Sequence, residues 1–232
     1  MPEQLGKMAL IVPFLGLELL KPLFTKIQHE FCAKGFFSGF TAALNNVLIT
    51  VLRSGMGSER VVDAALALHA CGVAHIAFAG TAGALHPEIQ LGDLWIPDAC
   101  IQVTLEDLLE KNNIQLKMEL KLPQNLTLLN QWTPSPHRGL HASLPSVLLL
   151  DQHRAMQLKN LNVQAVDLEA AQLAMLATHL GFNLTIALTV SDLPLTQPLG
   201  SLTDAQRKLV LDQHLLHIRA TLDALIHGES RS

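Results

Sequence analysis

The stretch AVDLEAAQLAML, residues 165–176, joins a short apolar segment to an alanine-rich segment with helical spacing. Asp167 suits a helix cap at that junction, because a carboxylate accepts hydrogen bonds from the first free N–H groups of a helix. Glu169 has no such explanation, since carboxylates are rarely buried unless another group pairs with them. The stretch therefore predicts a buried strand that passes directly into a buried helix, with an acid placed for function between them.

The composition bounds the fold and excludes several classes of function. The chain has 232 residues, of which 49% are hydrophobic and 16% are charged, which is typical of a globular protein. Its net charge of −4 comes without the basic clusters of a nucleic-acid-binding protein. Three scattered cysteines favour neither a disulfide framework nor a zinc site, and they fit a cytoplasmic protein. The apolar run at residues 8–20 is too short to span a membrane and does not resemble a signal peptide.

Apolar runs of strand length alternate with segments of helical spacing along the chain. Strands are predicted at residues 8–14, 46–53, 73–80, 92–97 and 183–190. Helices are predicted at residues 18–31, 58–72 and 203–227. This alternation predicts an α/β fold, in which residues 1–232 form a single domain with a central, mostly parallel mixed sheet flanked by helices. Residues 111–145 show no clear period, and we interpret them as a loop or an irregular excursion near a site.

A glycine turn, RSGMGSER at residues 53–60, follows one predicted strand and opens a predicted helix. Gly55 and Gly57 permit a tight turn, and the free N–H groups of a helix start can hold an anion or a sugar oxygen. A dinucleotide-binding fingerprint needs a third glycine where Arg60 stands, and no acid follows at the end of the next strand. A nicotinamide-dependent enzyme is therefore disfavoured, while a plain strand–helix turn remains the alternative to a ligand-binding one.

A second small-residue segment is AGTAGALHPEIQLGD, residues 79–93. Thr81, Ala82 and Gly83 lie where a predicted strand ends, and open α/β sheets bind ligands at that edge. Small residues there let the backbone approach a ligand closely. The alternative is a turn that simply leads into the next strand at Gly92 and Asp93.

The segment TVSDLP, residues 189–194, ends a very apolar strand with Ser191 and Asp192. Asp192 suits either a turn cap or a proton donor held at the sheet edge. The eleven histidines form no H-E-x-x-H motif, and we interpret most of them as surface or hydrogen-bonded residues. The sequence also lacks a G-x-S-x-G nucleophile elbow and the lysine of a phosphate-binding P-loop.

Together these stretches resemble the nucleoside phosphorylase and nucleosidase superfamily. Its pattern is an SGxG turn, then GTAGALHP and GD, then VDLEAA, then VSD, and the match covers about residues 46–193. Residues 139–174 look most like the hopanoid-associated phosphorylases. They also resemble the methylthioadenosine/S-adenosylhomocysteine nucleosidases and the futalosine hydrolases. The order of four motifs is more specific than any one of them.

The resemblance implies a role for each acidic motif. Glu169 would accept hydrogen bonds from the ribose hydroxyls, and Leu168 stands where a methionine usually packs under the sugar. Asp192 would protonate N7 of the purine or form a hydrogen bond to it, so that the base leaves as a neutral molecule. This role requires a raised pKa, which burial beside the apolar strand at 183–190 can supply. The remaining substrate-binding candidates are Asp167, Ser191, Gly55, Gly57, Thr81, Ala82 and Gly83.

The sequence departs from the family pattern where water or phosphate is handled. Phosphorylases of the superfamily commonly carry an arginine near the position of Phe78, and nucleosidases carry one at the position of Leu188. Glu18 is a loose counterpart of the glutamate that orients water in nucleosidases. Other arginines would have to substitute for the missing ones. The candidates are Arg53, Arg60, Arg138 and Arg154, each of which also suits a solvated surface position.

We therefore expect an enzyme that cleaves the N-glycosidic bond of an adenine-type purine nucleoside, which can carry a bulky 5′ substituent. Hydrolysis is favoured over phosphorolysis, because no arginine stands on the strand before the glycine motif. The resemblance implies a cytoplasmic homo-oligomer that binds a nucleoside, with phosphate as a second substrate if the reaction is phosphorolysis. It implies neither a metal nor an organic cofactor. The alternative is a non-catalytic nucleoside-binding protein that has lost the water or phosphate half of the site.

Overall fold

The sheet grows outward from β1 (Met8–Val12), whose five residues are all buried because helices cover both faces of the sheet. On one side β1 pairs in parallel with β4 (Val47–Arg53). Two antiparallel strands, β3 (Phe37–Leu44) and β2 (Lys26–Ala33), extend this side to the edge. In the computed structural model the described residues are 5–33, 37–109, 114, 119–122, 132 and 134–229.

On its other side β1 pairs in parallel with β5 (His75–Ala84), which begins a closed ring of five strands. β5 pairs in parallel with β10 (Asn183–Asp192), and β10 pairs antiparallel with β6 (Leu94–Gln102). β6 pairs in parallel with β8 (His137–Ser143), and β8 with β9 (Val163–Asp167). The ends of β9 and β5 pair antiparallel and complete the ring. This closure brings the ends of β5, β9 and β10 together.

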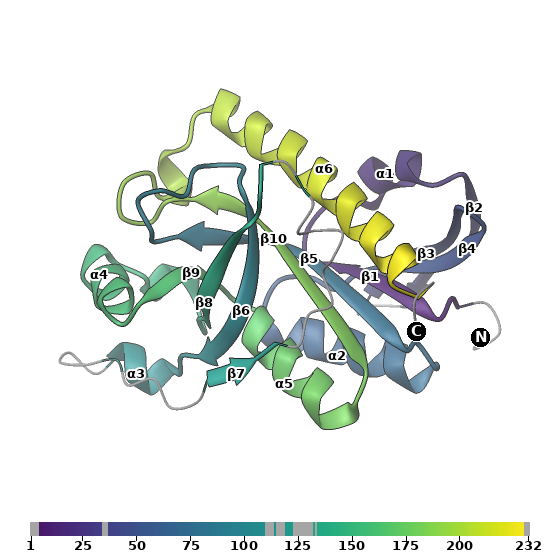
Figure 1. Ribbon diagram of the computed structural model, residues 1–232, viewed down its shortest axis with the longest axis horizontal. Coiled ribbons are helices and arrows are strands. Elements are labelled where there is room, and N and C mark those ends of the chain that lie inside the picture. Colours follow the sequence, from purple (N-terminus) through teal and green to yellow (C-terminus); the bar gives the residue numbers. More distant parts are fainter. Residues whose placement is uncertain are drawn as a thin grey trace.

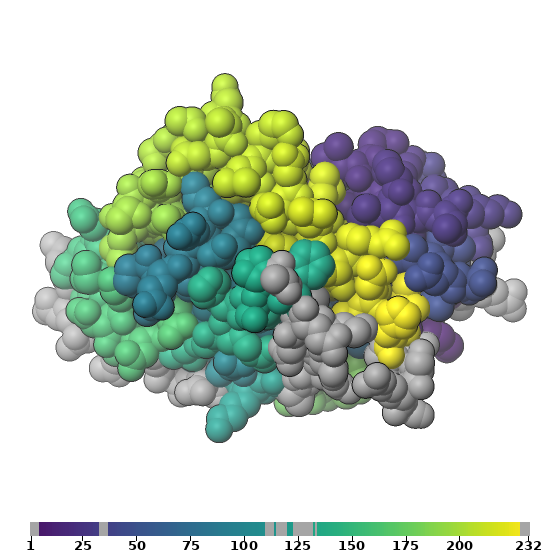
Figure 2. Space-filling model, turned by 45° about the horizontal axis from the view of Figure 1, so that its top comes forward, coloured from purple at the N-terminus to yellow at the C-terminus, as the bar shows by residue number. Residues whose placement is uncertain are grey.

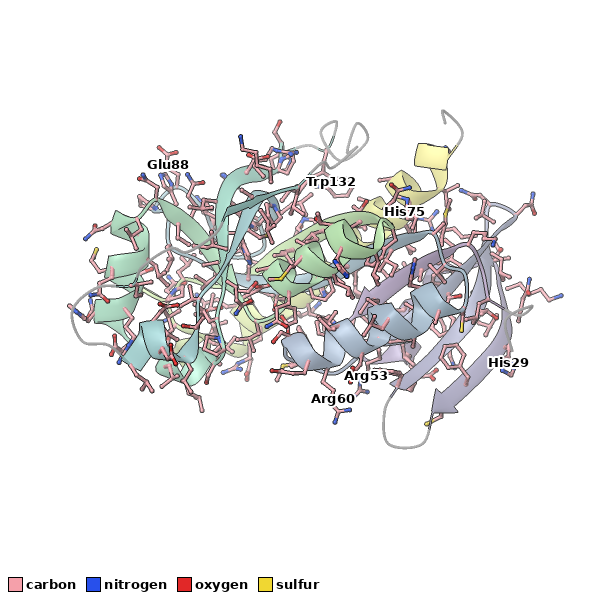
Figure 3. All side chains as sticks on the ribbon, turned by 90° about the horizontal axis from the view of Figure 1, so that it is seen from below. His29, Arg53, Arg60, His75, Glu88 and Trp132 are labelled. Atoms are coloured by element: carbon pink, nitrogen blue, oxygen red, sulfur yellow. The ribbon has the colours of Figure 1, made fainter. Side chains whose placement is uncertain are left out.

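Three long helices cover the two faces of the sheet (Figure 1). α2 (Ser58–Ala70) and α5 (Ala170–Leu180) pack side by side on one face, which Figure 3 views from their side. α6 (Asp204–Glu229) crosses β5 and β10 on the opposite face. Because side chains alternate along a strand, Phe78 of β5 packs toward α2 and α5, and Ala77 toward α6.

Shorter elements complete the described part of the chain. The helices are α1 (Leu17–Leu20), α3 (Leu105–Leu109) and α4 (Gln152–Asn160). The 3₁₀ turns are η2 (Lys21–Leu23), η4 (Val147–Leu149) and η5 (Leu199–Ser201). β7 (Glu119–Lys121) pairs antiparallel with β6. Among the described residues, none of the helices has the length and apolarity that a membrane crossing requires.

The α/β fold and the mixed sheet are confirmed, but parallel pairs are not in the majority. Five of the ten pairings between described strands are parallel and five are antiparallel. Two of the antiparallel pairs arise because β2, β3 and β4 follow one another as a meander. The strands predicted at 8–14 and 46–53 and the helices at 58–72 and 203–227 lie within a few residues of their observed bounds.

Two predictions about local structure are wrong. The helix predicted at 18–31 is replaced by α1, η2 and β2, because Pro22 opens a 3₁₀ turn and the chain then pairs with β3 as an edge strand. The region 111–145, interpreted as irregular, contains β7 and the seven residues of β8. Of that region, residues 111–113, 115–118, 123–131 and 133 lie outside the described residues.

Candidate functional site

Asp192 is the last residue of β10 and lies against the end of β5, where it pairs with Gly83. The register shifts between Val190 and Asp192, which is a bulge. A Cβ atom on Gly83 would lie 2.9 Å from Cγ of Pro194 and 3.3 Å from both carboxylate oxygens of Asp192. Glycine at position 83 therefore provides the space in which the Asp192 carboxylate sits.

Glu169 connects the start of α5 to the glycine turn that precedes α2. Its Oε1 accepts a hydrogen bond from the backbone N–H of Gly57 at 2.6 Å, and its Oε2 accepts one from Leu168 at 3.2 Å. Gly57 has φ of +100°, a conformation that side-chain-bearing residues rarely adopt. The Glu169 side chain is buried, with the whole residue 5% exposed. Two separate motifs of the sequence, SGMG and VDLEAA, are thus joined by one carboxylate.

Asp167 caps the start of α5 with its side chain, as the sequence suggests, although the N-cap position is Glu169, and Asp167 is also the centre of a buried hydrogen-bond network. Its Oδ2 accepts from the N–H of Ala170 at 2.9 Å, and its Oδ1 accepts from the Ser143 hydroxyl at 2.5 Å. The same Ser143 oxygen accepts from the N–H of Ala171 at 2.8 Å. Two free N–H groups of the first turn of α5 are therefore satisfied. The buried Asp167 carboxylate therefore bonds to the start of α5 and to Ser143.

His141 extends this network toward β6. Its Nδ1 accepts a hydrogen bond from Nε1–H of Trp95 at 3.1 Å, so the proton of a neutral ring lies on Nε2. Nε2 lies 2.9 Å from Oδ1 of Asp167, but outside hydrogen-bonding geometry. Both side chains are almost completely buried. The His141 ring therefore lies close to the Asp167 carboxylate but does not form a hydrogen bond with it.

The two candidate catalytic acids both have raised pKa values. Burial, and next the charge of Asp167, raise the pKa of Glu169 to about 7, while the N–H groups of Gly57 and Leu168 act in the opposite direction. Burial also raises the pKa of Asp192, against hydrogen bonds from the Ser191 hydroxyl and the backbone N–H of Leu199. The shift for Asp192 has the direction and the cause that a proton donor needs.

A cavity of about 330 Å³ is lined by residues of three of the four sequence motifs. Met56 of the glycine turn, Thr81 of β5 and Ser191 of β10 line it on one side. Ser191 donates to Oδ1 of Asp192 at 2.8 Å and lies 3.3 Å from the carbonyl oxygen of Ala82. The other lining residues are Phe14, Leu199, Leu202, Arg207, Val210, Leu211 and His214. Figure 2 shows α6 and the segment before it covering this face, beside the N-terminal elements.

Several predicted site residues lie elsewhere in the structure. Phe78 and Leu188 are fully buried in the apolar core between the sheet and the helices α2 and α5. Leu168 is half-buried and packs against a separate apolar cluster that includes Leu85 and Val166. Glu18 is exposed on α1 and forms an ion pair with Lys21 at 2.8 Å.

The four arginines considered as substitutes for the missing ones do not line the cavity. Arg53 and Arg60 are exposed, and Figure 3 shows Arg60 pointing away from α2 at the edge of the molecule. Arg138 pairs with Asp98 at 2.8 Å. Arg154 pairs with its own helix cap and donates to the carbonyl oxygen of Leu108.

The sequence interpretation missed two groups of residues. The first group, which supports the start of α5, consists of Ser143, His141 and Trp95. The only signal in the sequence is that Ser143 and His141 lie in the segment 139–174, which resembles the superfamily. Arg207 and His214 line the cavity from α6, where a lone arginine and a histidine carry no motif. Among the described residues, no three His, Cys, Asp or Glu side chains converge in a way that holds a metal ion.

Comparisons with known proteins agree with this fold. A sequence model of the phosphorylase superfamily matches residues 8–227. Uridine phosphorylase from Vibrio fischeri superposes with a TM-score of 0.80 at 16% identity, covering 97% of this chain and 93% of that one. Campylobacter jejuni 5′-methylthioadenosine/S-adenosylhomocysteine nucleosidase gives 0.77 at 17% identity, with 94% and 98% covered. A Helicobacter pylori futalosine hydrolase mutant gives 0.76 at 17% identity, with 94% and 99% covered. A sequence comparison with curated proteins finds no match.

Proposed function

Because the chain belongs to the phosphorylase superfamily, we propose that it cleaves the N-glycosidic bond of an adenine-type purine nucleoside that can carry a bulky 5′ substituent. One observation carries the proposal. The buried Glu169 and the half-buried Asp192 both have raised pKa values, and each bonds next to or at a residue that lines the cavity: Glu169 to Gly57, which follows Met56, and Asp192 to Ser191. Perturbed carboxyl groups that border a cavity are candidates for acid–base and charge-stabilising roles.

Asp192 is the proposed general acid. In the protonated form, which its raised pKa favours, it donates to N7 of the purine as the bond to the sugar breaks. The base then leaves as a neutral molecule, and the proton that Asp192 gives up is replaced when the attacking water loses one. A positioned acid of this kind contributes ~10²–10⁴ in rate.

Glu169 is the proposed ribose-binding residue. As a carboxylate it has about four lone-pair sites, and the N–H groups of Gly57 and Leu168 occupy two of them. The remaining sites suit two sugar hydroxyls. The sugar becomes positively charged as the base departs, so these contacts strengthen in the transition state and lower the barrier.

Hydrolysis is the favoured reaction, because the position where phosphorylases commonly carry an arginine is Phe78, a core residue. The same observation, with the exposed position of Glu18, motivates the second candidate, a nucleoside-binding protein without turnover. We further propose a homo-oligomer in the cytoplasm. Large exposed apolar side chains such as Leu109 and Leu148 support an oligomer, since an interface would cover them.

The proposed reaction is tested by adenine release from adenosine, methylthioadenosine, S-adenosylhomocysteine and aminofutalosine, measured chromatographically with and without phosphate. Release without phosphate, lost in Asp192→Asn, supports a nucleosidase. Release only with phosphate makes the chain a phosphorylase and contradicts the preference for hydrolysis. Binding without release from any of the compounds favours the non-catalytic candidate. Light scattering of the purified protein tests the oligomer.

A further inference from the structure

A second cavity, of about 450 Å³, lies against a different set of α6 residues from the cavity beside Ser191, which is the first cavity. Its residues on α6 follow one another at spacings of four, seven and eight positions, which place them on one face of the helix. They are Leu209, Gln213, Leu216 and His217. The opposite wall comes from the start of β6 and from the segment before β8. The middle of α6 therefore separates two distinct cavities.

Asp93 gives the second cavity a negative charge. Among the described residues that line this cavity, it is the only aspartate, glutamate, lysine or arginine. Its Oδ2 accepts a hydrogen bond from the N–H of Gln90 at 2.7 Å and lies 3.1 Å from Nε2 of His137. Its Oδ1 has no bonding partner in the described part of the chain, and the side chain is 25% exposed. A cation that enters the cavity can therefore reach a free carboxylate oxygen.

Two aromatic rings line the same cavity. The ring centroids of Trp132 and His217 lie 5.9 Å apart, with an angle of 73° between the ring planes. Aromatic faces attract cations, and tryptophan does so most strongly. Burial lowers the pKa of His217 to about 4, against the charge of Asp93, so this ring is neutral at pH 7. Apolar residues such as Leu94 and Leu209 supply much of the remaining wall.

The Thr189 hydroxyl links the two cavities. Its oxygen lies 2.8 Å from Nδ1 of His217 in the second cavity and 3.0 Å from Nδ1 of His214, which lines the first. Burial, and next the neighbouring His217, lower the pKa of His214 to about 4, so each of these neutral rings carries one N–H. Thr189 is fully buried, and its own proton has no other acceptor in the described part of the chain. Thr189 therefore donates to one ring and accepts from the other.

This arrangement gives the two histidines opposite tautomers. When His217 carries its proton on Nδ1, Thr189 donates to His214, whose own proton then lies on Nε2. When His217 carries its proton on Nε2, that of His214 lies on Nδ1. The Nε2 of His214 is buried without a partner among the described residues. The tautomer therefore decides whether His214 offers the first cavity a hydrogen-bond donor or an acceptor.

We propose that the second cavity binds an organic ammonium ion with an apolar tail, and that its occupation fixes His214 as a hydrogen-bond donor to the first cavity. An ammonium group has three donors. One meets the free Oδ1 of Asp93, and another meets Nε2 of His217, which has no partner in the described part of the chain. A donor at this Nε2 holds the proton of His217 on Nδ1, and through Thr189 that of His214 on Nε2. The Trp132 ring stabilises the charge.

Two compounds of similar size test the site: 2-phenylethylamine, which is charged at pH 8 as a lysine side chain is, and the neutral 2-phenylethanol. In calorimetric titrations of the wild type at pH 8 we expect the amine to bind at least about fivefold tighter, a modest ratio because Asp93 is partly exposed. Asp93→Asn should bring this ratio close to one. Asp212→Asn, the matched control, should keep it, because Asp212 pairs with Lys208 and does not line the cavity. Equal affinities in the wild type, or a preference that persists in Asp93→Asn, would overturn the site.

The coupling is tested by ¹⁵N NMR of protein labelled at histidine, which reports the ring nitrogen that carries each proton. His214→Gln and His217→Gln assign the signals. The free protein should give averaged signals, since no described residue bonds to Nε2 of either ring. With the amine bound, we expect the His217 proton on Nδ1 and the His214 proton on Nε2. Unchanged signals, or protons on the same nitrogen in both rings, would overturn the coupling.

Two variants of the linking residue sharpen this measurement. Thr189→Val keeps the shape of the side chain without its hydroxyl, so the signals of His214 should no longer respond to the amine. Thr189→Ser keeps the hydroxyl and should respond as the wild type does. A response of His214 that persists in Thr189→Val would contradict the link through Thr189. None of these measurements requires turnover, so failure of the proposed cleavage reaction and failure of this inference are distinguished.

Discussion

Replacing Glu169 with glutamine is expected to stabilise the fold at alkaline pH while removing most of the activity. The pKa of Glu169 is raised from its ordinary value of 4.5 to about 7, first by burial and then by the charge of Asp167. The folded protein therefore binds this proton more tightly than the unfolded chain does. As the pH rises from 4.5 through 7, ionisation of Glu169 lowers the free energy of unfolding.

The size of this effect follows from the two pKa values. Their difference of about 2.5 corresponds to ~3 kcal/mol, because one pKa unit is worth about 1.36 kcal/mol. Most of it, ~2 kcal/mol, falls between pH 5 and pH 8. Glutamine carries no charge and avoids this loss. It gives up one hydrogen bond, since its amide nitrogen cannot accept from the N–H of Leu168, at a cost of ~1 kcal/mol that does not depend on pH.

Guanidinium unfolding of the wild type and Glu169→Gln at pH 5 and pH 8 measures this directly. The variant should gain ~2 kcal/mol relative to the wild type between the two pH values. Glu88→Gln removes the same charge from an exposed position, visible at the surface in Figure 3, and should show no such gain. Turnover of Glu169→Gln should fall by ~10²–10³, the usual effect of losing one preorganised charge-stabilising group. Identical pH dependence in the wild type and Glu169→Gln, or turnover within tenfold of the wild type, would refute the reasoning.

Three further predictions concern the surroundings of the site. Asp192→Asn should lose ~10²–10⁴ in turnover, and the wild-type rate should fall with rising pH as Asp192 loses its proton; a variant within tenfold of the wild type contradicts this. Gly57→Ala and Gly181→Ala each force a side chain into positive φ, +100° and +76°, and should lower the free energy of unfolding by ~1–3 and ~1 kcal/mol, because Gly57 also has a ψ of 151° that is essentially confined to glycine. Only Gly57→Ala should also lower turnover, because Gly181 lies away from the site and has nothing within 4 Å of its missing Cβ; equal turnover of the two variants would contradict the role of Glu169. Ser143→Ala leaves two buried groups unpaired and should destabilise the fold by ~1–3 kcal/mol in chemical denaturation. The half-buried Ser146 accepts one hydrogen bond, from the N–H of Leu148 at the start of η4, so Ser146→Ala should cost only ~1 kcal/mol or less, and an equal effect of the two serine variants would contradict the network.

The parts of the fold that the sequence predicts well are those with strong local patterns. The apolar run of β4 and the helical spacing of α2 are sufficient to predict these two elements, and α6 begins one residue from its predicted start. β3 is not recognisable, since Ser38, Gly39 and Ala42 have weak strand propensity, and Gly39 and Ala42 become buried only when two strands pair with β3. β8 is not recognisable either, because it begins with polar residues and its burial depends on pairing with β6 and β9.

The site shows the same division between local and distant information. The sequence singles out Glu169, but its partner Gly57 lies 112 residues earlier, and only the fold brings them together. The sequence also marks Phe78 and Leu188 as unusual positions. Their positions in the structure explain the departure physically: both side chains fill the core against α2 and α5 instead of facing the cavity. Arg207 and His214 are recognised only because helix α6 crosses the sheet beside the cavity.

The most direct test of the central claim is to watch the glycosidic bond by proton NMR, with methylthioadenosine and a stoichiometric amount of wild-type protein in phosphate-free buffer. The proposed reaction predicts that the ribose H1′ signal of the nucleoside disappears and that the signals of free adenine replace it. The Asp192→Asn protein, in a parallel sample, should leave the spectrum nearly unchanged over the same time. Nucleoside signals that broaden on binding but persist with the wild type, with or without added phosphate, would contradict a glycosidic-bond-cleaving enzyme.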